Sequence, residues 1–238
     1  MRLIAGNDLT LASAANESHH YSKSKKATNQ RDQVRQVGTE VNSGGQFTAV
    51  AGQDLTLVSS SIAANDEAYL VAGGKVQLLA AQDYDYFFSE KKKKKSFGRK
   101  SYRMNESSSS MAIESLVSAG NNLSIYSGSN LLSEGARLHS GEHLTLLAAM
   151  DIQLLAAQDS QSQAQAKSKR GLLSSKAKTN NQSQIIELGF EFGFIKEVER
   201  KLRLFAAGTE LLCFQQTIEF FWDFNAPVSH CKFFCLNV

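Results

Sequence analysis

The sequence predicts an all-β protein whose main body is a parallel β-helix, a solenoid of stacked short strands. Three observations lead to this expectation: a long internal repeat, a shorter period inside it, and a strand-like alternation of apolar and polar residues. A single unit of this kind cannot bury its own apolar face, whereas stacked units bury a continuous core. We therefore expect rungs of parallel sheet about 4.8 Å apart.

The long repeat joins two segments of equal length. Residues 41–83 align without gaps with residues 117–159, at an offset of 76, and both copies end in QLLAAQD. A period of 21 residues runs inside each copy, so that VNSGGQFTAVAGQDLTL (41–57) matches IAANDEAYLVAGGKVQL (62–78). Residues 5–11, AGNDLTL, are the end of another such unit. The repeat predicts similar rungs over most of the first 185 residues.

Each 21-residue unit is typical of short strands separated by Gly, Asn and Asp. In AGQDLTLV, Leu55 and Leu57 point to one side and Thr56 to the other, as in a strand with one buried face. Glycines at the predicted corners, such as Gly52 and Gly120, are expected to provide the positive φ that corners often need. The residues expected to face inward are Leu55, Leu57, Val76, Leu78, Leu123, Ile125, Leu144, Leu146, Ile152 and Leu154.

Three long polar stretches interrupt the rungs, at about 18–39, 83–110 and 160–184. They hold eighteen of the twenty-one basic residues found in residues 1–185. Each follows the same point of the repeat, and insertions at one point of a repeat lie on one side of a solenoid. We expect them to protrude along one side as polar hairpins or mobile loops.

The composition divides the chain near Gln184. Residues 1–185 contain no Cys, Pro or Trp, whereas residues 186–238 hold all three Cys, the one Pro and the one Trp. The 21-residue period is not found in this second part. We predict a β-helix over 1–185 and an irregular or partly helical tail over 186–238, with an amphipathic helix from Phe194 to Phe205. A frameshift product and the start of a distinct domain would both explain the change.

Charge and motifs exclude several classes of function. The formal net charge of +3 is too small by itself to indicate a nucleic-acid-binding protein. No apolar stretch is long enough for a membrane helix, and the N-terminal residues do not have the pattern of a secretion signal. No phosphate-binding loop, nucleophile motif or metal-ligand spacing is found. We expect a protein that is not an enzyme, with no catalytic, cofactor-binding or metal-binding residues.

The polar residues at the predicted corners fit this expectation. Asp54, Lys75, Asn130 and Asp151 occupy equivalent positions of the 21-residue period. Equivalent positions on stacked rungs form a ladder. We therefore interpret these residues as a corner ladder and not as a catalytic group.

A basic run in the second polar stretch is the main candidate for ligand contact. Its charge density could attract an anionic ligand such as lipopolysaccharide or a sulfated glycan. Alternatively, the run is a solvated hairpin edge that repels other edges. The aromatic residues Tyr84, Tyr86, Phe87 and Phe88 could stack on sugars or pack across the base of the hairpin. The candidate contact residues are Lys91, Lys92, Lys93, Lys94, Lys95, Arg99 and Lys100.

Several segments resemble a known family. AGNDLTLASA, VSAGNNLSIYSGSN and the twice-used LLAAQD resemble the haemagglutinin repeats of filamentous haemagglutinins and contact-dependent growth inhibition exoproteins. LLAAQD followed by a Ser/Lys-rich stretch such as KSKRGLLSSKAKTNNQSQ is similar to the later class of repeats in those proteins. The resemblance covers about residues 1–185. It implies a right-handed β-helix filament that is secreted to the bacterial surface through a dedicated outer-membrane partner.

Such filaments serve in adhesion or carry a C-terminal toxin to a neighbouring cell. The resemblance therefore implies a structural shaft and interaction segment of an adhesin or inhibition exoprotein, with a cell-surface glycan or lipopolysaccharide as the candidate ligand. Two alternatives stay open: a toxin or effector remnant whose activity lies in the tail or outside this chain, and a polysaccharide-active β-helix enzyme. The secretion domain of the family is not recognised in this sequence, which by itself would be retained in the cytoplasm.

Overall fold

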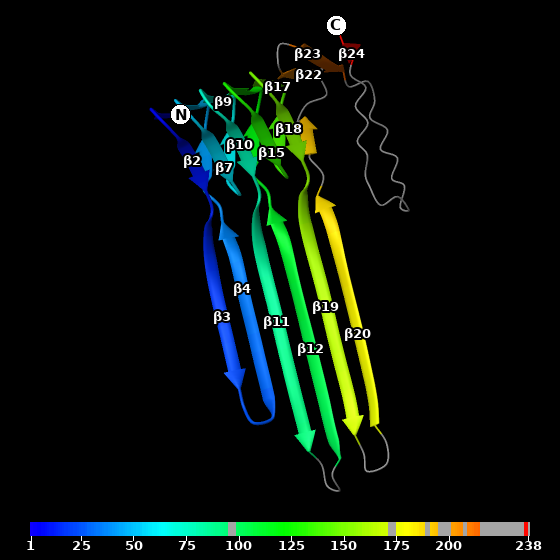
Figure 1. Ribbon diagram of the computed structural model, residues 1–238. Helices are drawn as coiled ribbons and strands as arrows, with labels where there is room; N and C mark the ends of the chain where they lie inside the picture. Colours follow the sequence, from blue (N-terminus) through cyan, green and yellow to red (C-terminus); the bar gives the residue numbers. More distant parts are fainter. Residues whose placement is uncertain are drawn as a thin grey trace.

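The computed structural model describes residues 1–94, 99–170, 175–188, 191–194, 201–206, 209–214 and 236–237. Every regular element in this part of the chain is a β-strand, as the sequence predicts for residues 1–185. Short strands form three sheets that the chain visits in turn, and long strands form an antiparallel sheet that projects from them (Figure 1). No helix that could span a membrane occurs within these ranges.

One turn of the coil, called a rung below, takes one strand from each of the three sheets. The described residues hold four complete rungs, from β5–β7 to β16–β18, with partial rungs on both sides. Sheet 1 holds β5 (Glu40–Ser43), β8 (Ser61–Ala64), β13 (Leu116–Ala119), β16 (Arg137–Ser140) and β21 (Glu191–Phe194). Sheet 2 begins with β1 (Arg2–Ala5), β6 (Phe47–Ala51), β9 (Ala68–Ala72), β14 (Leu123–Ser127), β17 (His143–Ala148) and β22 (Lys201–Ala206). Sheet 3 holds β2 (Leu9–Ala12), β7 (Leu55–Val58), β10 (Val76–Leu79), β15 (Leu131–Glu134) and β18 (Ile152–Leu155).

The parallel pairing follows the period of the sequence. Val41 pairs with Ile62, and Val117 pairs with Leu138, each 21 residues later. Ile62 in turn pairs with Val117. These two residues are more than 21 positions apart in the sequence because the long insertion of residues 81–113 lies between their rungs. This topology is consistent with the predicted β-helix.

The three polar stretches are hairpins, which is one of the two forms predicted from the sequence (hairpins or mobile loops). Each follows a strand of sheet 3, and together they form the hairpin sheet, in which every neighbouring pair is antiparallel. A hairpin follows every second rung. Each repeating unit of the chain therefore adds two strands to every sheet of the coil and two strands to the hairpin sheet. The strands of the hairpin sheet, in spatial order, are β3 (Ala14–Lys23), β4 (Ala27–Val37), β11 (Ala81–Lys94), β12 (Lys100–Ile113), β19 (Ala157–Arg170) and β20 (Ser175–Leu188).

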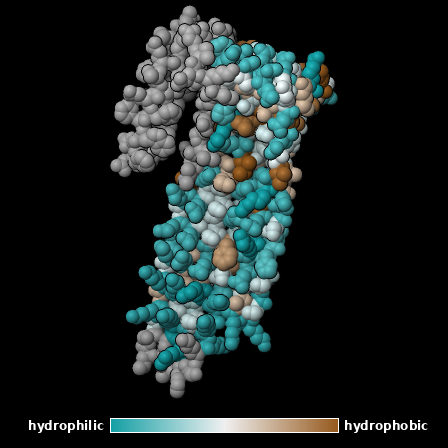
Figure 2. Space-filling model, turned by 180° about the vertical axis from the view of Figure 1, so that it is seen from behind, coloured by the Kyte–Doolittle hydropathy of each residue, from teal (hydrophilic) through white to brown (hydrophobic). Residues whose placement is uncertain are grey.

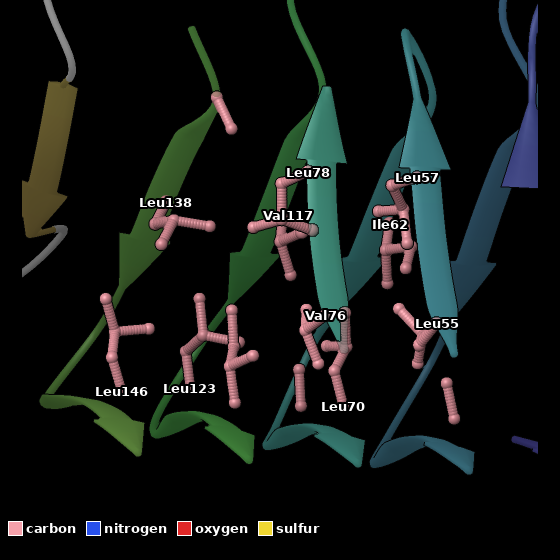
Figure 3. Packing of buried hydrophobic residues seen from close by; sticks show 14 of the residues in the cluster. Leu55, Leu57, Ile62, Leu70, Val76, Leu78, Val117, Leu123, Leu138 and Leu146 are labelled. Atoms are coloured by element: carbon pink, nitrogen blue, oxygen red, sulfur yellow. The ribbon is translucent and has the colours of Figure 1, made fainter. Parts of the chain in front are cut away.

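Apolar side chains from alternate positions fill the interior of the coil (Figure 3). Eight of the ten predicted inward residues are at most 1% exposed: Leu55, Leu57, Val76, Leu78, Leu123, Ile125, Leu144 and Leu146. Full burial of a side chain of this size contributes about 1.5–3 kcal/mol. Ile152 and Leu154 pack against the same core but are only partly buried, because β18 is the terminal strand of sheet 3 in the described region.

Side-chain oxygens link the rungs at the corner between sheets 2 and 3. The backbone N–H of Asp54 donates to Oδ1 of Asp8 at 3.0 Å, and that of Lys75 donates to Oδ1 of Asp54 at 2.8 Å. The N–H of Asp151 donates in the same way to Oδ1 of Asn130 at 3.2 Å. The predicted corner ladder is confirmed. It is interrupted after Lys75, whose side chain has no acceptor atom.

The corner glycines have a different role from the expected one. Among the described residues Gly135 is the one glycine with a positive φ, of 65°, so the expectation for Gly52 and Gly120 is wrong. A Cβ on Gly120 would lie 1.9 Å from the carbonyl oxygen of Asn65, and one on Gly52 would lie 2.0 Å from that of Gly6. These positions need glycine because the backbone of the neighbouring rung passes too close for a side chain.

A left-handed residue marks the corners at which sheet 3 leads directly into sheet 1. Ser59 follows β7 with a φ of 47°, and Gly135 follows β15 with a φ of 65°. The two positions are equivalent, 76 residues apart. After β10 and β18 the chain enters a hairpin instead. The left-handed conformation costs a residue with a Cβ about 1–2 kcal/mol. The backbone N–H of Ser59 donates to the carbonyl oxygen of Leu79 on the next rung at 2.9 Å, which helps to hold it there.

The tail departs from the sequence expectation. β20 runs through the predicted boundary at residue 185, and β21 and β22 extend sheets 1 and 2 in parallel. β23 (Thr209–Phe214) and β24 (Leu236–Asn237) then add to β22 in antiparallel pairing. The division of the chain into two domains stays a prediction.

The prediction of a helix from Phe194 to Phe205 is wrong for the residues that the structure describes. Phe194 ends β21, and residues 201–205 lie in β22; residues 195–200 are outside the described residues. The segment KLRLFA alternates charged and apolar residues, which also fits a strand. Its backbone pairs with β17, whose N–H and C=O groups would otherwise form an open sheet edge.

Two carboxylates join each later hairpin to the one before it. Oδ1 of Asp83 accepts a hydrogen bond from the backbone N–H of Gln36, and Oδ1 of Asp159 accepts one from that of Ala112, both at 2.6 Å. Both Asp residues end a copy of QLLAAQD. Backbone pairing between the hairpins stops two residues before these N–H groups. The carboxylates therefore satisfy donors that the ladder no longer reaches.

We expect Gly120→Ala to lower the free energy of unfolding by about 1–3 kcal/mol, because the added methyl group overpacks the corner. Gly44→Ala is the matched control, since a Cβ there has no heavy atom within 4 Å, and should change stability by less than about 1 kcal/mol. Urea unfolding of the full chain measures both. Equal losses for the two variants would contradict the close-approach explanation.

We expect Asp83→Ala and Asp159→Ala each to cost about 1–3 kcal/mol, because each leaves a partly buried backbone N–H without its charged acceptor. Asp85→Ala is the control, since its ion pair with Arg35 is more exposed and such pairs contribute at most about 1 kcal/mol. Hydrogen exchange should show faster exchange at the amides of Gln36 and Ala112 in the first two variants. Unchanged exchange at both amides would refute the proposed link.

Candidate interaction surface

The hairpin sheet projects from the coil as a layer of six strands (Figure 1). Side chains alternate between the two faces of a sheet, and directly paired residues share a face. Pairing is continuous from β11 through β12 and β19 to β20. The face that carries Lys91 and Lys93 is called the basic face below, and the other the opposite face. Seen from behind, the projecting part is mostly hydrophilic, with isolated apolar residues (Figure 2).

Near the coil, the basic face carries a polar network between the first two hairpins. Arg35 donates to Oδ2 of Asp85 at 2.6 Å, and Gln33 donates to its Oδ1 at 2.8 Å. The hydrogen bonds from Gln33 and then Arg35 hold the pKa of Asp85 below its ordinary value. Arg31 and Phe87 line an open hollow beside this network. The hollow offers hydrogen-bonding groups but no enclosed space for a small substrate.

The opposite face carries a smaller charged cluster on the first hairpin. Nδ1 of His19 is 3.2 Å from Oδ1 of Asp32, and its Nε2 is 3.5 Å from Oε2 of Glu17. The hydrogen bonds with Asp32 and then Glu17 raise the pKa of His19. Gln30 donates to Oδ2 of Asp32 at 2.6 Å, and this bond is the main cause of the lowered pKa of Asp32. The cluster connects β3 to β4.

The basic run predicted as a ligand site is divided between the two faces. Lys91 and Lys93 lie on the basic face, whereas Lys92 and Lys94 lie on the opposite face. Nζ of Lys92 is 2.6 Å from Oε1 of Glu90, and this hydrogen bond raises the pKa of Lys92. The run is therefore shared between two faces, and its contact with an anionic ligand stays a prediction.

The other residues of the predicted ligand contact are Lys95, Arg99 and Lys100, of which Lys100 does not share a face with Lys91. Lys100 is paired with Lys94 and shares the opposite face. Arg99 immediately precedes β12 and is exposed. Lys95 lies outside the described residues.

Other cations lie beside Lys91 on the basic face. Arg103 is paired with Lys91, Lys167 with Arg103, and Lys178 with Lys167. The sequence prediction did not include the lysines of the third hairpin. The 76-residue repeat could have revealed them, since the repeat aligns Lys91 with Lys167 and Lys93 with Lys169 in the sequence.

The aromatic residues of β11 do not form one platform. Tyr84 is 39% exposed and Phe87 is 43% exposed, but they lie on different faces because their positions differ by an odd number. Tyr86 and Phe88 are half-buried on the face of Tyr84. Burial and a hydrogen bond of 3.0 Å to Glu106 raise the pKa of Tyr86.

Within the described ranges, no group of three or more His, Cys, Asp or Glu side chains is arranged to hold a metal ion. His139 and His143 belong to neighbouring strands, β16 and β17. The tail residues His230, Cys231 and Cys235 are outside the described residues.

Comparison with known proteins identifies a family and a curated relative. The sequence profile of the hemagglutinin repeat matches residues 19–98 and 95–201. Over 149 residues the chain is 29% identical to the 16S rRNA endonuclease CdiA of Enterobacter cloacae subsp. cloacae. That alignment covers 62% of this chain but 4% of CdiA, so the chain spans a small part of this relative's length. No solved structure matches the chain.

The two profile matches together extend from the first hairpin to β22 and cover well over half of the chain. They contain the four complete rungs, the second and third hairpins and both copies of QLLAAQD. The chain belongs to the hemagglutinin repeat family, as a repeat region of the type found in filamentous haemagglutinins and contact-dependent growth inhibition exoproteins.

Proposed function

We propose that this segment is part of the shaft of a secreted bacterial surface protein, an adhesin or a contact-dependent growth inhibition exoprotein, and that its hairpins serve in interaction. The observation that carries the proposal is the repeating unit of two rungs and one hairpin. Such a unit buries its apolar face only against its neighbours, so that adding units lengthens the molecule without changing its cross-section.

Export and the geometry of the coil are further parts of the proposal. The family uses an outer-membrane secretion partner, and its members are secreted or displayed at the cell surface; we propose the same for the protein to which this segment belongs. We also propose that the coil is right-handed, as most connections between parallel strands are.

We propose no catalytic role for the segment. The polar corner residues that could line a groove in a β-helix enzyme are engaged in the corner ladder, as in the bonds from Lys75 to Asp54 and from Asp151 to Asn130. The activity in the name of CdiA belongs to that protein, of which the alignment covers 4%. A toxin or effector role of the tail is the alternative.

Duplication of one repeating unit tests the shaft proposal. A second copy of residues 41–116, inserted before Val117, adds two rungs and one hairpin. We expect the particle to become longer by roughly 9–10 Å along the coil, which is two strand spacings. Small-angle scattering and electron microscopy measure the length.

The matched control duplicates one rung alone, as a second copy of residues 41–61 inserted before Ile62. This adds one strand spacing to the coil and none to the hairpin sheet, so the pairing of β4 with β11 should open and its amides should exchange faster. If the unit duplication left the length unchanged, or if the single rung were accommodated with β4 and β11 still paired, the shaft proposal would fail.

A further inference from the structure

Two rows of cations cross the outer part of the basic face. The first row contains Lys91, Arg103, Lys167 and Lys178, which are successive partners on β11, β12, β19 and β20. Neighbouring members are therefore about 4.8 Å apart in the backbone. The second row lies two residues farther from the coil, and its members are Lys93, Ser101, Lys169 and Lys176.

Within the described part of the chain, no acidic side chain forms an ion pair with these cations. All seven side chains are exposed. Like charges placed directly opposite each other destabilise a sheet. On the opposite face Lys92 is neutralised by an ion pair with Glu90, and one shorter row of cations is formed by Lys94, Lys100 and Arg170. The basic face thus holds a repulsion that an anionic ligand would relieve.

A polar row lies next to the first cationic row, on the side of the coil. Its members are Asn29, Ser89, Asn105, Gln165 and Asn180, again successive partners on one face. Their amide and hydroxyl groups can donate to and accept from sugar hydroxyls. The three rows contain no aromatic residue, and Tyr102 lies on the opposite face. Single-stranded nucleic acid is usually bound by stacking on aromatic side chains, so this surface favours a sugar polymer.

We propose that the basic face binds an acidic polysaccharide along the strand-to-strand direction. Sulfate, phosphate or carboxylate groups lie over the two cationic rows, and sugar hydroxyls lie over the polar row. The inference rests on the proposed interaction role of the hairpins. It does not depend on the shaft length, so the duplication experiment and the binding experiment can fail separately.

Two variants of the full chain with equal change in charge test the inference. The first is Lys91→Gln/Arg103→Gln/Lys167→Gln/Lys178→Gln, on the basic face. The control is Lys23→Gln/Lys94→Gln/Lys100→Gln/Arg170→Gln, on the opposite face. The probe is chondroitin sulfate, with desulfated chondroitin and a thymidine oligonucleotide as comparison ligands, and calorimetry at two salt concentrations gives the Kd.

We expect the basic-face variant to bind chondroitin sulfate at least tenfold more weakly and with a shallower salt dependence, because fewer counterions are released. The control variant should stay within threefold of the unchanged chain. Desulfated chondroitin, which keeps its carboxylates but has a lower charge density, should bind the unchanged chain more weakly than chondroitin sulfate does. The melting temperature of the basic-face variant should not fall, since the change removes repulsion, and this separates lost binding from lost folding.

Three results would overturn the inference. Equal losses in the two variants would show attraction by net charge alone. If the unchanged chain did not bind chondroitin sulfate, acidic polysaccharides would be excluded as the ligand class. Binding of the oligonucleotide as tight as that of chondroitin sulfate, with the same dependence on the basic face, would assign the surface to nucleic acid instead.

Discussion

The equal spacing of strands in the coil and in the hairpin sheet is the constraint on which the rest of the structure depends. Neighbouring strands are about 4.7–4.9 Å apart in parallel and antiparallel sheets alike. Two rungs advance the coil by two spacings, and one hairpin advances the hairpin sheet by the same amount. A hairpin after every rung would need twice the available height, and a hairpin after every third rung would leave strands without partners.

This constraint explains why the chain has two kinds of corner after sheet 3. A direct corner turns through one left-handed residue, as at Ser59 and Gly135. The corners that open into the second and third hairpins carry QLLAAQD, whose Asp83 or Asp159 binds the backbone of the preceding hairpin. Since the two kinds alternate, the strongest repeat in the sequence is 76 residues, although the apolar pattern repeats every 21.

The sequence was sufficient for the rungs because their core is encoded locally. Leu55 and Leu57 alternate with polar neighbours, and the same alternation returns at Val76 and Leu78 with the same spacing. Contacts between backbones could not be predicted in this way. Whether Gly120 is needed for its φ or for its missing Cβ depends on the position of Asn65 in the rung beside it. The segment Lys201–Ala206 likewise fits two periodicities, and pairing with β17 decides between them.

The candidate site shows how a sheet rearranges a charge cluster that is continuous in sequence. Consecutive residues of a strand point to opposite faces, so Lys91 and Lys92 are separated, whereas Lys91 and Arg103 become neighbours. Clusters on a sheet therefore run across strands, and their length is set by the number of hairpins. In a longer filament each added hairpin of this composition extends both cationic rows by two positions. A polymer bound along these rows gains contacts at every hairpin and so binds more tightly as the shaft lengthens, which links the repeat that builds the shaft to the ligand class inferred for its surface.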